Sequence, residues 1–576
     1  MLNTFTDSIK ILNQNQKSRF IILIFLIIIS SLLETLSIGL IIPLLYFLSQ
    51  TKESVFIKLN ELEYIPLIFK NFVSDLNYFF LILIIVVFFF LIFLFKNFFF
   101  ILLNYYQANF CYLIQTYQSK KLLSVYMKKD LNFYDYNSHS LVISNIINEV
   151  AKFTSLILLS IINLITELAL LVCLSALLLY LFPLETLLSI AILSVFSCIF
   201  IIFTKKKHKF YGEQKQLSEK RRIQDLLTIF QLLKEINLRQ TNNYFLDKFD
   251  INTKKSFEID KKNLFISKLP RILLEIVIFF LILIYLIIQK FNGIDFNSLI
   301  PVIATFLAAL IRLLPSAGKI IQSINNLKFA KPVVTILQKE LLNNEIHSTK
   351  ITRKVKKEIF TNYIEFKNVK FKYKDSDKYI IKNLSFKLNK GEILGVSGAS
   401  GTGKSTFLDL LMLLRKPNSG NIIVDGKTKL NQSIWHKSIG YLSQNVDLIN
   451  DTLINNILLG LNNNDKINSK IFDLIDKLNL KKKIDSLPGK INYKVGDYGV
   501  KFSGGEKQRL NLIRVLCINP EILILDEPTS SLDNYNEILV LKLIKSLKGI
   551  KTIILITHNK KNLEICDKKI LLDKYK

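Results

Sequence analysis

Long apolar runs dominate the first half of this chain and limit the folds that it can adopt. The runs cover residues 20–48, 79–103, 155–181, 184–203, 272–288 and 298–320. Each is close to, or longer than, the ~20 residues that an α-helix needs to cross a bilayer. Half of the 576 residues are hydrophobic, and the mean hydropathy is +0.33. We therefore predict a membrane α-helical domain with about six transmembrane spans.

Basic residues are concentrated in two long segments between the apolar runs, at residues 105–154 and 205–271. Because positively charged loops stay on the cytoplasmic side of a membrane, both segments are expected to face the cytoplasm, together with the two termini. Apolar residues at helical spacing, such as Leu226, Phe230 and Leu233, predict that the segments are helices that project from the membrane.

Two compositional features lead to no functional assignment. The net charge is +30, but lysine, asparagine and isoleucine are all abundant, so the charge can be a background property and does not predict nucleic-acid binding. The five cysteines are scattered and lack metal-ligand spacing. The sequence therefore predicts neither a disulfide framework nor a cysteine-based metal site.

The sequence changes character after the last apolar run. Residues 331–361 are polar and charged and are predicted to be a linker. From residue 362 to residue 576, short β-rich runs alternate with helical segments, which is typical of a soluble α/β domain. The predicted organisation is a transmembrane domain at residues 1–330, the linker, and an α/β domain of the P-loop class.

A glycine-rich loop at residues 398–405, GASGTGKS, lies between a predicted buried strand and a predicted helix. Its glycines leave room for backbone N–H groups to bind phosphate oxygens at a helix N-terminus. In this pattern Lys404 reaches the β- and γ-phosphates, and the Ser405 hydroxyl binds Mg²⁺. Because strand and helix flank the loop, a nucleotide-phosphate site is favoured over a chance glycine turn.

Two further motifs carry groups that phosphate hydrolysis needs. The predicted strand at residues 522–525 ends in Asp526, which can hold Mg²⁺ through water, and Glu527, which can act as general base. A second glycine-rich turn, Ser503-Gly504-Gly505, opens a helix and can offer N–H groups and a hydroxyl to phosphate. Such a turn is weak evidence alone, because Ser-Gly-Gly is also common in linkers.

With these motifs, the chain resembles an ATP-binding cassette (ABC) transporter of the exporter type, in which a membrane domain precedes its ATPase. The resemblance covers nearly the whole chain and implies ATP and Mg²⁺ as cofactors. It identifies residues 398–405 as the Walker A loop, Asp526 as the Walker B aspartate and Glu527 as the catalytic base. It also assigns the signature Ser503-Gly504-Gly505 to the ATP site of a partner chain, which implies a homodimer, or a heterodimer with a paralogue.

The resemblance implies further nucleotide contacts, which rest on the family pattern because a single tyrosine or histidine is also common as a structural residue. Gln444 matches the Q-loop glutamine, His558 the switch histidine and Tyr373 the aromatic that stacks on adenine. The residues predicted to bind nucleotide are Tyr373, Gly398, Ala399, Ser400, Gly401, Thr402, Gly403, Lys404, Ser405, Thr406, Gln444, Ser503, Gly504, Gly505 and Asp526. Ser405, Gln444 and Asp526 are the predicted Mg²⁺ ligands, and Glu527 and His558 are the predicted catalytic residues.

The signature departs from the usual Leu-Ser-Gly-Gly-Gln at Phe502 and Glu506, and Asp497 replaces a glutamate that commonly precedes it. Glu506 adds negative charge near a bound polyphosphate, which can weaken nucleotide sandwiching or alter its Mg²⁺ dependence. The predicted catalytic set remains complete, so the site is not predicted to be degenerate.

Ionisable residues within the apolar runs mark candidate substrate contacts, because they are costly in a bilayer. They are Glu34, Lys96, Glu167, Glu275 and Arg312, with Arg271 at the entrance of the fifth run. Snorkelling or structural ion pairing is the alternative interpretation.

Among exporters, the chain resembles the lipid-linked oligosaccharide flippases of bacterial protein glycosylation, through residues 34–43, 269–275 and 312–317. This resemblance implies a lipid with a pyrophosphate-linked sugar, captured by Lys96, Arg271 and Arg312. It also implies a location in the bacterial cytoplasmic membrane, with the ATPase domain in the cytoplasm.

Other functions stay open at this stage. A peptide or drug exporter has the same architecture, and the phenylalanines at residues 88–90 and 98–100 are compatible with it. A non-transporting regulator or channel is disfavoured by the presence of Glu527 and His558. In either transporter, the loop tips at residues 138–145 and 227–235 are expected to dock on the ATPase surface close to Gln444.

Overall fold

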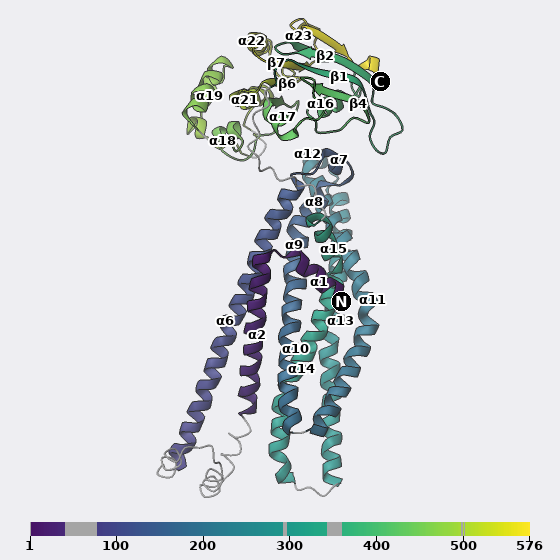
Figure 1. The fold of residues 1–576 in the computed structure, drawn as a ribbon, viewed down its shortest axis with the longest axis vertical. Helices are drawn as coiled ribbons and strands as arrows, with labels where there is room; N and C mark the ends of the chain where they lie inside the picture. The colour runs from purple at the N-terminus through teal and green to yellow at the C-terminus, as the bar shows by residue number, and fades with distance from the viewer. Residues whose placement is uncertain are drawn as a thin grey trace. The chain divides into compact units, whose positions relative to one another are not determined.

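The computed structural model describes residues 2–40, 78–181, 183–291, 296–342, 360–462, 464–496, 499 and 501–575. The chain divides into two compact units (Figure 1). The helical unit comprises Met1–Lys129 and Phe133–Ile351, and the α/β unit comprises Asp130–Asn132 and Thr352–Lys576. The domain and linker boundaries drawn from the sequence stay a prediction.

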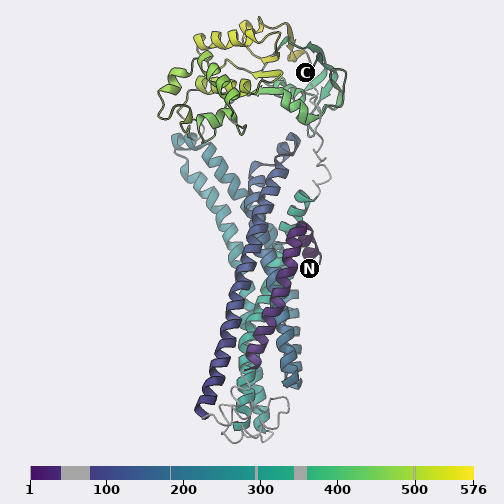
Figure 2. The same cartoon turned by 60° about the vertical axis from the view of Figure 1, so that its left-hand side comes forward.

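Long helices that run side by side form the helical unit (Figure 2). They are α2 (Gln14–Gly39), α6 (Tyr78–Tyr126), α10 (Leu159–Leu181), α11 (Pro183–Gln231), α13 (Asn242–Phe291) and α14 (Phe296–Phe329). Each predicted apolar run falls wholly or partly in one of them. Within the described residues, three helical stretches are long and apolar enough to cross a membrane: Gln14–Gly39, Ile82–Tyr126 and His139–Tyr180. The predicted count of six spans is not confirmed.

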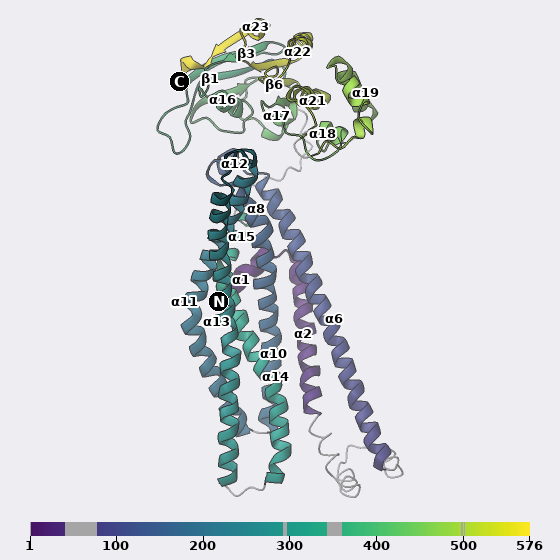
Figure 3. The same ribbon diagram turned by 180° about the vertical axis from the view of Figure 1, so that it is seen from behind.

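The two segments that were predicted to project as helices are helical, with α6, α11 and α13 each continuing well beyond its apolar run (Figure 3). Short elements complete the first segment: α7 (Leu131–Tyr136), α8 (His139–Ser144), the π-helix η1 (Asn145–Glu149), α9 (Val150–Lys152) and the π-helix η2 (Phe153–Leu158). The second segment contains α12 (Leu233–Arg239). The helical unit also includes α1 (Leu2–Ile11).

The start of the predicted linker is a packed helix, α15 (Lys331–Leu341). Val333, Leu337 and Leu341 recur every four residues and are buried in the same core as α1 and α2. The polar residues between them gave this stretch its linker-like composition, but the apolar side chains share one helix face. The other residues of the predicted linker lie largely outside the described residues, which resume at Phe360.

The described residues of the α/β unit form two sheets. The antiparallel sheet has the order β2-β1-β4, with β1 (Tyr363–Phe371), β2 (Ile381–Asn389) and β4 (Ser419–Val424). The parallel sheet has the order β5-β6-β7-β3-β8. Its strands are β3 (Ile393–Ser397), β5 (Ile439–Leu442), β6 (Ile522–Asp526), β7 (Thr552–Ile556) and β8 (Lys568–Leu571).

Both faces of the parallel sheet are covered, which explains why its central strands are continuous apolar runs. Alternate residues of β6 belong to different cores: Leu523 packs with the helix α21 (Gly504–Cys517), and Ile524 packs with the helix α16 (Lys404–Leu411). The loops that follow β3, β6 and β7 leave from the same edge of the sheet, because parallel strands end there.

Shorter helices complete the α/β unit. They are α17 (Gln432–Ser438), α18 (Leu453–Leu458), α19 (Asp465–Lys477), α20 (Lys481–Asp485), α22 (Asn534–Ser546) and α23 (Lys560–Leu563), with the 3₁₀ turns η4 (Lys490–Asn492) and η6 (Leu572–Tyr575).

Candidate nucleotide site

The predicted phosphate loop joins β3 to α16, as the sequence pattern requires. Gly401 and Gly403 have φ angles of 79° and 89°, in the left-handed region that favours glycine. Gly403 is the N-cap residue of α16, so the unpaired N–H groups of that helix begin directly after it. A phosphate group in the loop would accept hydrogen bonds from these N–H groups.

Lys404 is held within the loop by two contacts. Its Nζ donates a hydrogen bond to the Gly398 carbonyl at 2.7 Å and lies 2.5 Å from Nε2 of His558, which follows β7. Phosphate oxygens would take over the donors that Lys404 now directs to these two groups.

Glu527 follows β6 and is oriented from several sides. Its φ angle is 50°, an uncommon conformation for a residue other than glycine and one that often marks functional sites. Nε2 of Gln444 donates to Oε2 at 2.8 Å, and Nε2 of His558 lies 3.3 Å from Oε1. Nε2 of Gln508 donates to the Glu527 carbonyl at 2.7 Å. The structure thus brings together Lys404, Gln444, Glu527 and His558.

Asp526 lies beside this cluster in an environment that disfavours its charge. Burial and the neighbouring Glu527 carboxylate raise the pKa of Asp526 to about 6, against the opposing effect of Lys404. A divalent cation would relieve this excess of negative charge. Ser405, Gln444 and Asp526 offer the oxygen ligands that Mg²⁺ prefers. These residues therefore fit a Mg²⁺ ion that would be bound jointly by the protein and by the phosphate oxygens of a nucleotide.

Tyr373 contacts the residue that follows the phosphate loop. Its hydroxyl lies 3.2 Å from Oγ1 of Thr406, next to the predicted Mg²⁺ ligand Ser405. The guanidinium of Arg415 lies over the ring, 4.9 Å from its centroid, and Phe371 meets the ring edge. The sequence pattern did not identify Arg415.

The remaining loop residues have local roles. The Ala399 N–H donates to the Asp573 carboxylate at 3.3 Å, and the Thr402 hydroxyl donates to the Ala399 carbonyl at 2.9 Å. Ser400, Gly401 and Ser405 are exposed, as groups that receive a nucleotide must be.

The signature opens α21 and is ordered by a capping box. The Ser503 hydroxyl accepts from the Glu506 N–H at 3.2 Å, and the Glu506 carboxylate accepts from the Ser503 N–H at 2.8 Å. Gly505 has no room for a side chain, because a Cβ there would lie 2.8 Å from the Ser531 carbonyl. Asp497, the third departure from the family pattern, lies outside the described residues.

The predicted substrate cations lie on different helices. Lys96 of α6 lies over the ring of Phe93 on the same helix, 4.3 Å from its centroid. Arg271 of α13 is exposed, and its stem faces Gly318 of α14. The side chain of Arg312 lies outside the described residues. The convergence of Lys96, Arg271 and Arg312 therefore stays a prediction.

Glu167 is part of an ion pair within the helical unit. Nζ of Lys319 on α14 lies 2.7 Å from Oε1 of Glu167 on α10, and the Glu167 side chain is only 4% exposed. Glu167 is therefore interpreted as part of a structural ion pair and not as a substrate contact. Sequence reasoning missed Lys319 because it lies at the end of the last apolar run, where a lysine resembles an ordinary flanking charge.

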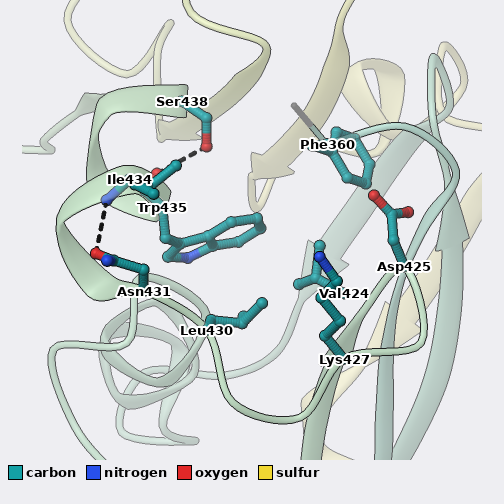
Figure 4. A pocket seen from close by; sticks show the side chains of 9 residues that line it. All are labelled: Phe360, Val424, Asp425, Lys427, Leu430, Asn431, Ile434, Trp435 and Ser438. Carbon is teal, nitrogen blue, oxygen red and sulfur yellow. Dashed lines mark hydrogen bonds between the residues drawn. The ribbon is translucent and has the colours of Figure 1, made fainter. Parts of the chain in front are cut away.

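A separate hollow in the α/β unit is lined by Phe360, Val424, Asp425, Lys427, Leu430, Asn431, Ile434, Trp435 and Ser438 (Figure 4). None of these belongs to the predicted nucleotide site. The Asp425 carboxylate accepts from the N–H groups of Thr361, Asn362 and Tyr363 at 2.6–2.9 Å. Asp425 therefore anchors the start of β1 to the turn after β4.

Replacing Asp425 by asparagine is expected to destabilise the α/β unit at neutral pH. Burial opposes ionisation of Asp425, but the three N–H groups outweigh it and hold its pKa below the usual value. The ionised carboxylate therefore stabilises the fold above the unfolded-state pKa, and this contribution is lost as the pH falls through the folded-state pKa. We expect the free energy of unfolding, measured by chemical denaturation at pH 7, to fall by about 1–2 kcal/mol. The difference in free energy of unfolding between the variant and the wild type should shrink toward pH 3. A difference that stayed constant would contradict this account.

Comparisons with known proteins identify similar sequences and folds. Residues 381–530 match the family model described as ABC transporter. A probable ABC transporter ATP-binding/permease protein of Haemophilus influenzae is 34% identical over 294 residues, 49% of this chain and 51% of the relative. A multidrug resistance ABC transporter ATP-binding and permease protein of Lactococcus lactis is 34% identical over 36% of this chain and 35% of the relative.

A mitochondrial iron-sulfur clusters transporter, ATM1, of Debaryomyces hansenii is 38% identical over 37% of this chain and 30% of the relative. The chain thus matches about half, or less, of the length of these curated relatives. A bacterial Atm1-family ABC exporter solved with ATP bound has a TM-score of 0.79 and 17% identity, covering 98% of this chain and 94% of that chain. The chain therefore has the fold of an ABC exporter, and its α/β unit matches the ABC transporter family over residues 381–530.

Proposed function

We propose that this chain hydrolyses ATP and uses the energy to move a substrate across a bacterial cytoplasmic membrane. The observation that carries the proposal is the cluster of Lys404, Gln444, Glu527 and His558 at the edge of a phosphate loop. The exporter fold of the whole chain supports the coupling to transport.

In the proposed reaction, the phosphate loop and Lys404 bind the β- and γ-phosphates of ATP. Glu527, held by Gln444, takes a proton from a water molecule as its oxygen bonds to the γ-phosphorus, and the bond to the β–γ bridging oxygen breaks. Mg²⁺, when bound by Ser405, Gln444 and Asp526, supplies positive charge to the phosphate oxygens.

His558 is released when the phosphates take over Lys404. Its Nε2, which lies 2.5 Å from the Lys404 ammonium, would then be free to donate a hydrogen bond to the γ-phosphate when it carries a proton. One chain therefore carries the groups that bind phosphate, orient the carboxylate base and respond to the nucleotide.

The working unit is proposed to be a homodimer. The signature serine is ordered by its own helix, and we propose that it contacts the γ-phosphate bound to the partner chain. Residues 138–145 and 227–235 are proposed to transmit the movement by docking near Gln444. An ATPase activity that stays proportional to protein concentration at high dilution in detergent would argue against the dimer.

The cargo is proposed to be a lipid with a pyrophosphate-linked sugar head, bound by Lys96, Arg271 and Arg312. Cations from separate helices would repel one another unless an anion lay between them, and arginine can bind phosphate oxygens in a bidentate manner. The relatives named above include a multidrug resistance transporter and an iron-sulfur clusters transporter, so the proposed cargo rests on these three residues and the sequence resemblance.

The cargo is tested by replacing Lys96, Arg271 and Arg312 together with glutamine. We expect ATP-dependent flipping of a fluorescent lipid-pyrophosphate sugar in proteoliposomes to fall at least ~10-fold, because the anion loses its partners. Basal ATPase activity should persist. The matched control replaces three exposed lysines, Lys206, Lys207 and Lys268, with glutamine. Undiminished flipping would remove this cargo and favour a peptide or drug exporter.

A further inference from the structure

We propose that Lys483 is a positioning residue of the signature, which offsets the charge of Glu506 so that the partner's ATP can bind there. The inference rests on the proposed function, because it assumes that Ser503 contacts a nucleotide. It concerns a lysine that the sequence motifs did not identify.

Glu506 has a structural role that explains its presence. Its carboxylate accepts from the Ser503 N–H, while its own N–H donates to the Ser503 hydroxyl oxygen. The hydroxyl hydrogen of Ser503 remains available to a phosphate oxygen. Glu506 therefore fixes the serine in a useful orientation, but it also places a carboxylate within the first turn of α21, where a polyphosphate would approach.

Lys483 offsets that charge. Its Nζ lies 3.7 Å from Oε1 of Glu506, and the Glu506 side chain is 18% exposed. The same Nζ lies over the ring of Phe502, 5.9 Å from its centroid. Both described departures from the family signature, Phe502 and Glu506, thus contact one lysine.

The position of Lys483 is set by packing, and the ion pair does not hold it alone. Leu480 and Ile484, on either side of it in sequence, are buried in the core that includes α21. Arg509 of α21 donates to the carbonyls of Leu478 and Asn479, directly before α20, at 3.0 and 3.2 Å. Helix α20, which carries Lys483, therefore packs in the same core as α21, which carries the signature, and the residues directly before α20 are hydrogen-bonded to α21.

Arg509 also interacts electrostatically with Glu506, but its hydrogen bonds are made to other groups. The Arg509 guanidinium is directed to backbone carbonyls and to Asn536, whose Oδ1 accepts at 2.7 Å. Lys481, on the same short helix, pairs with Asp476 at 3.4 Å. Lys483 thus offsets the Glu506 carboxylate, and the N–H groups at the start of α21 can attract a phosphate.

The test uses a double-mutant cycle in the full-length protein reconstituted in lipid. Lys483→Met should raise the KM for ATP roughly 3- to 10-fold, with a smaller change in kcat, because Glu506 then repels the partner's nucleotide. Glu506→Gln should have a KM at or below that of the wild type. Glu506→Gln combined with Lys483→Met should restore the KM of Glu506→Gln. Lys481→Met removes a lysine from the same helix and should leave the KM unchanged.

A second readout separates binding from turnover. In a Glu527→Gln background, the ATP concentration that half-saturates retention of radiolabelled ATP should rise with Lys483→Met and return with Glu506→Gln. A Lys483→Met protein that matches Lys481→Met, or a defect that Glu506→Gln does not rescue, would overturn the inference. A wild type that neither hydrolyses nor retains ATP would overturn the proposed function, and this inference with it.

Discussion

Replacing Glu527 by glutamine is expected to lower the rate of ATP hydrolysis roughly 100-fold or more, because general-base catalysis of this kind contributes about 10²- to 10⁴-fold. The amide keeps the shape of the carboxylate, and its oxygen can still accept from Gln444, but it cannot take a proton from water. ATP binding should therefore survive. The measurement is phosphate release together with binding of radiolabelled ATP, and Glu564→Gln, at an exposed site, is the control. Turnover near the wild-type rate would remove Glu527 from its assigned role.

Replacing Lys404 by alanine is expected to abolish binding itself, with an affinity for ATP at least ~100-fold lower. Its ammonium group now donates to the Gly398 carbonyl and to His558, and it is the only side-chain cation in the loop's eight residues. Hydrogen bonds between charged groups are among the strongest that a protein makes to phosphate. A fluorescent ATP analogue measures the affinity, and Lys416→Ala, at an exposed site after α16, is the matched control. Affinity within a few-fold of the wild type would show that the loop does not hold the phosphates in this way.

The α/β unit was largely predictable because its signals are local. The apolar run at residues 522–525 corresponds to β6, and that at residues 552–556 corresponds to β7. The glycines of the phosphate loop predicted a turn with room for phosphate, and the structure has Gly401 and Gly403 in left-handed conformations there. Parallel strands then place Glu527 and His558 near Lys404, since all three follow strand ends on one edge of the sheet.

Pairings between distant segments were not predictable, because no local spacing encodes them. Glu167 meets Lys319 across 152 positions of sequence. Lys483 meets Glu506 only because Arg509 and the apolar core hold α20 against α21. Helix α15 was also not predicted, because residues 331–341 have a mixed composition. Their apolar face is buried by helices that are distant in sequence.

The central claim, that ATP hydrolysis at this site drives transport, is tested most directly in sealed proteoliposomes loaded with labelled lipid-pyrophosphate sugar. We expect wild-type protein to move the lipid when ATP is supplied to the face that carries the α/β unit, and Glu527→Gln protein to bind ATP without moving it. Lipid movement that is equally fast without ATP, or equally fast in the Glu527→Gln protein, would contradict the account.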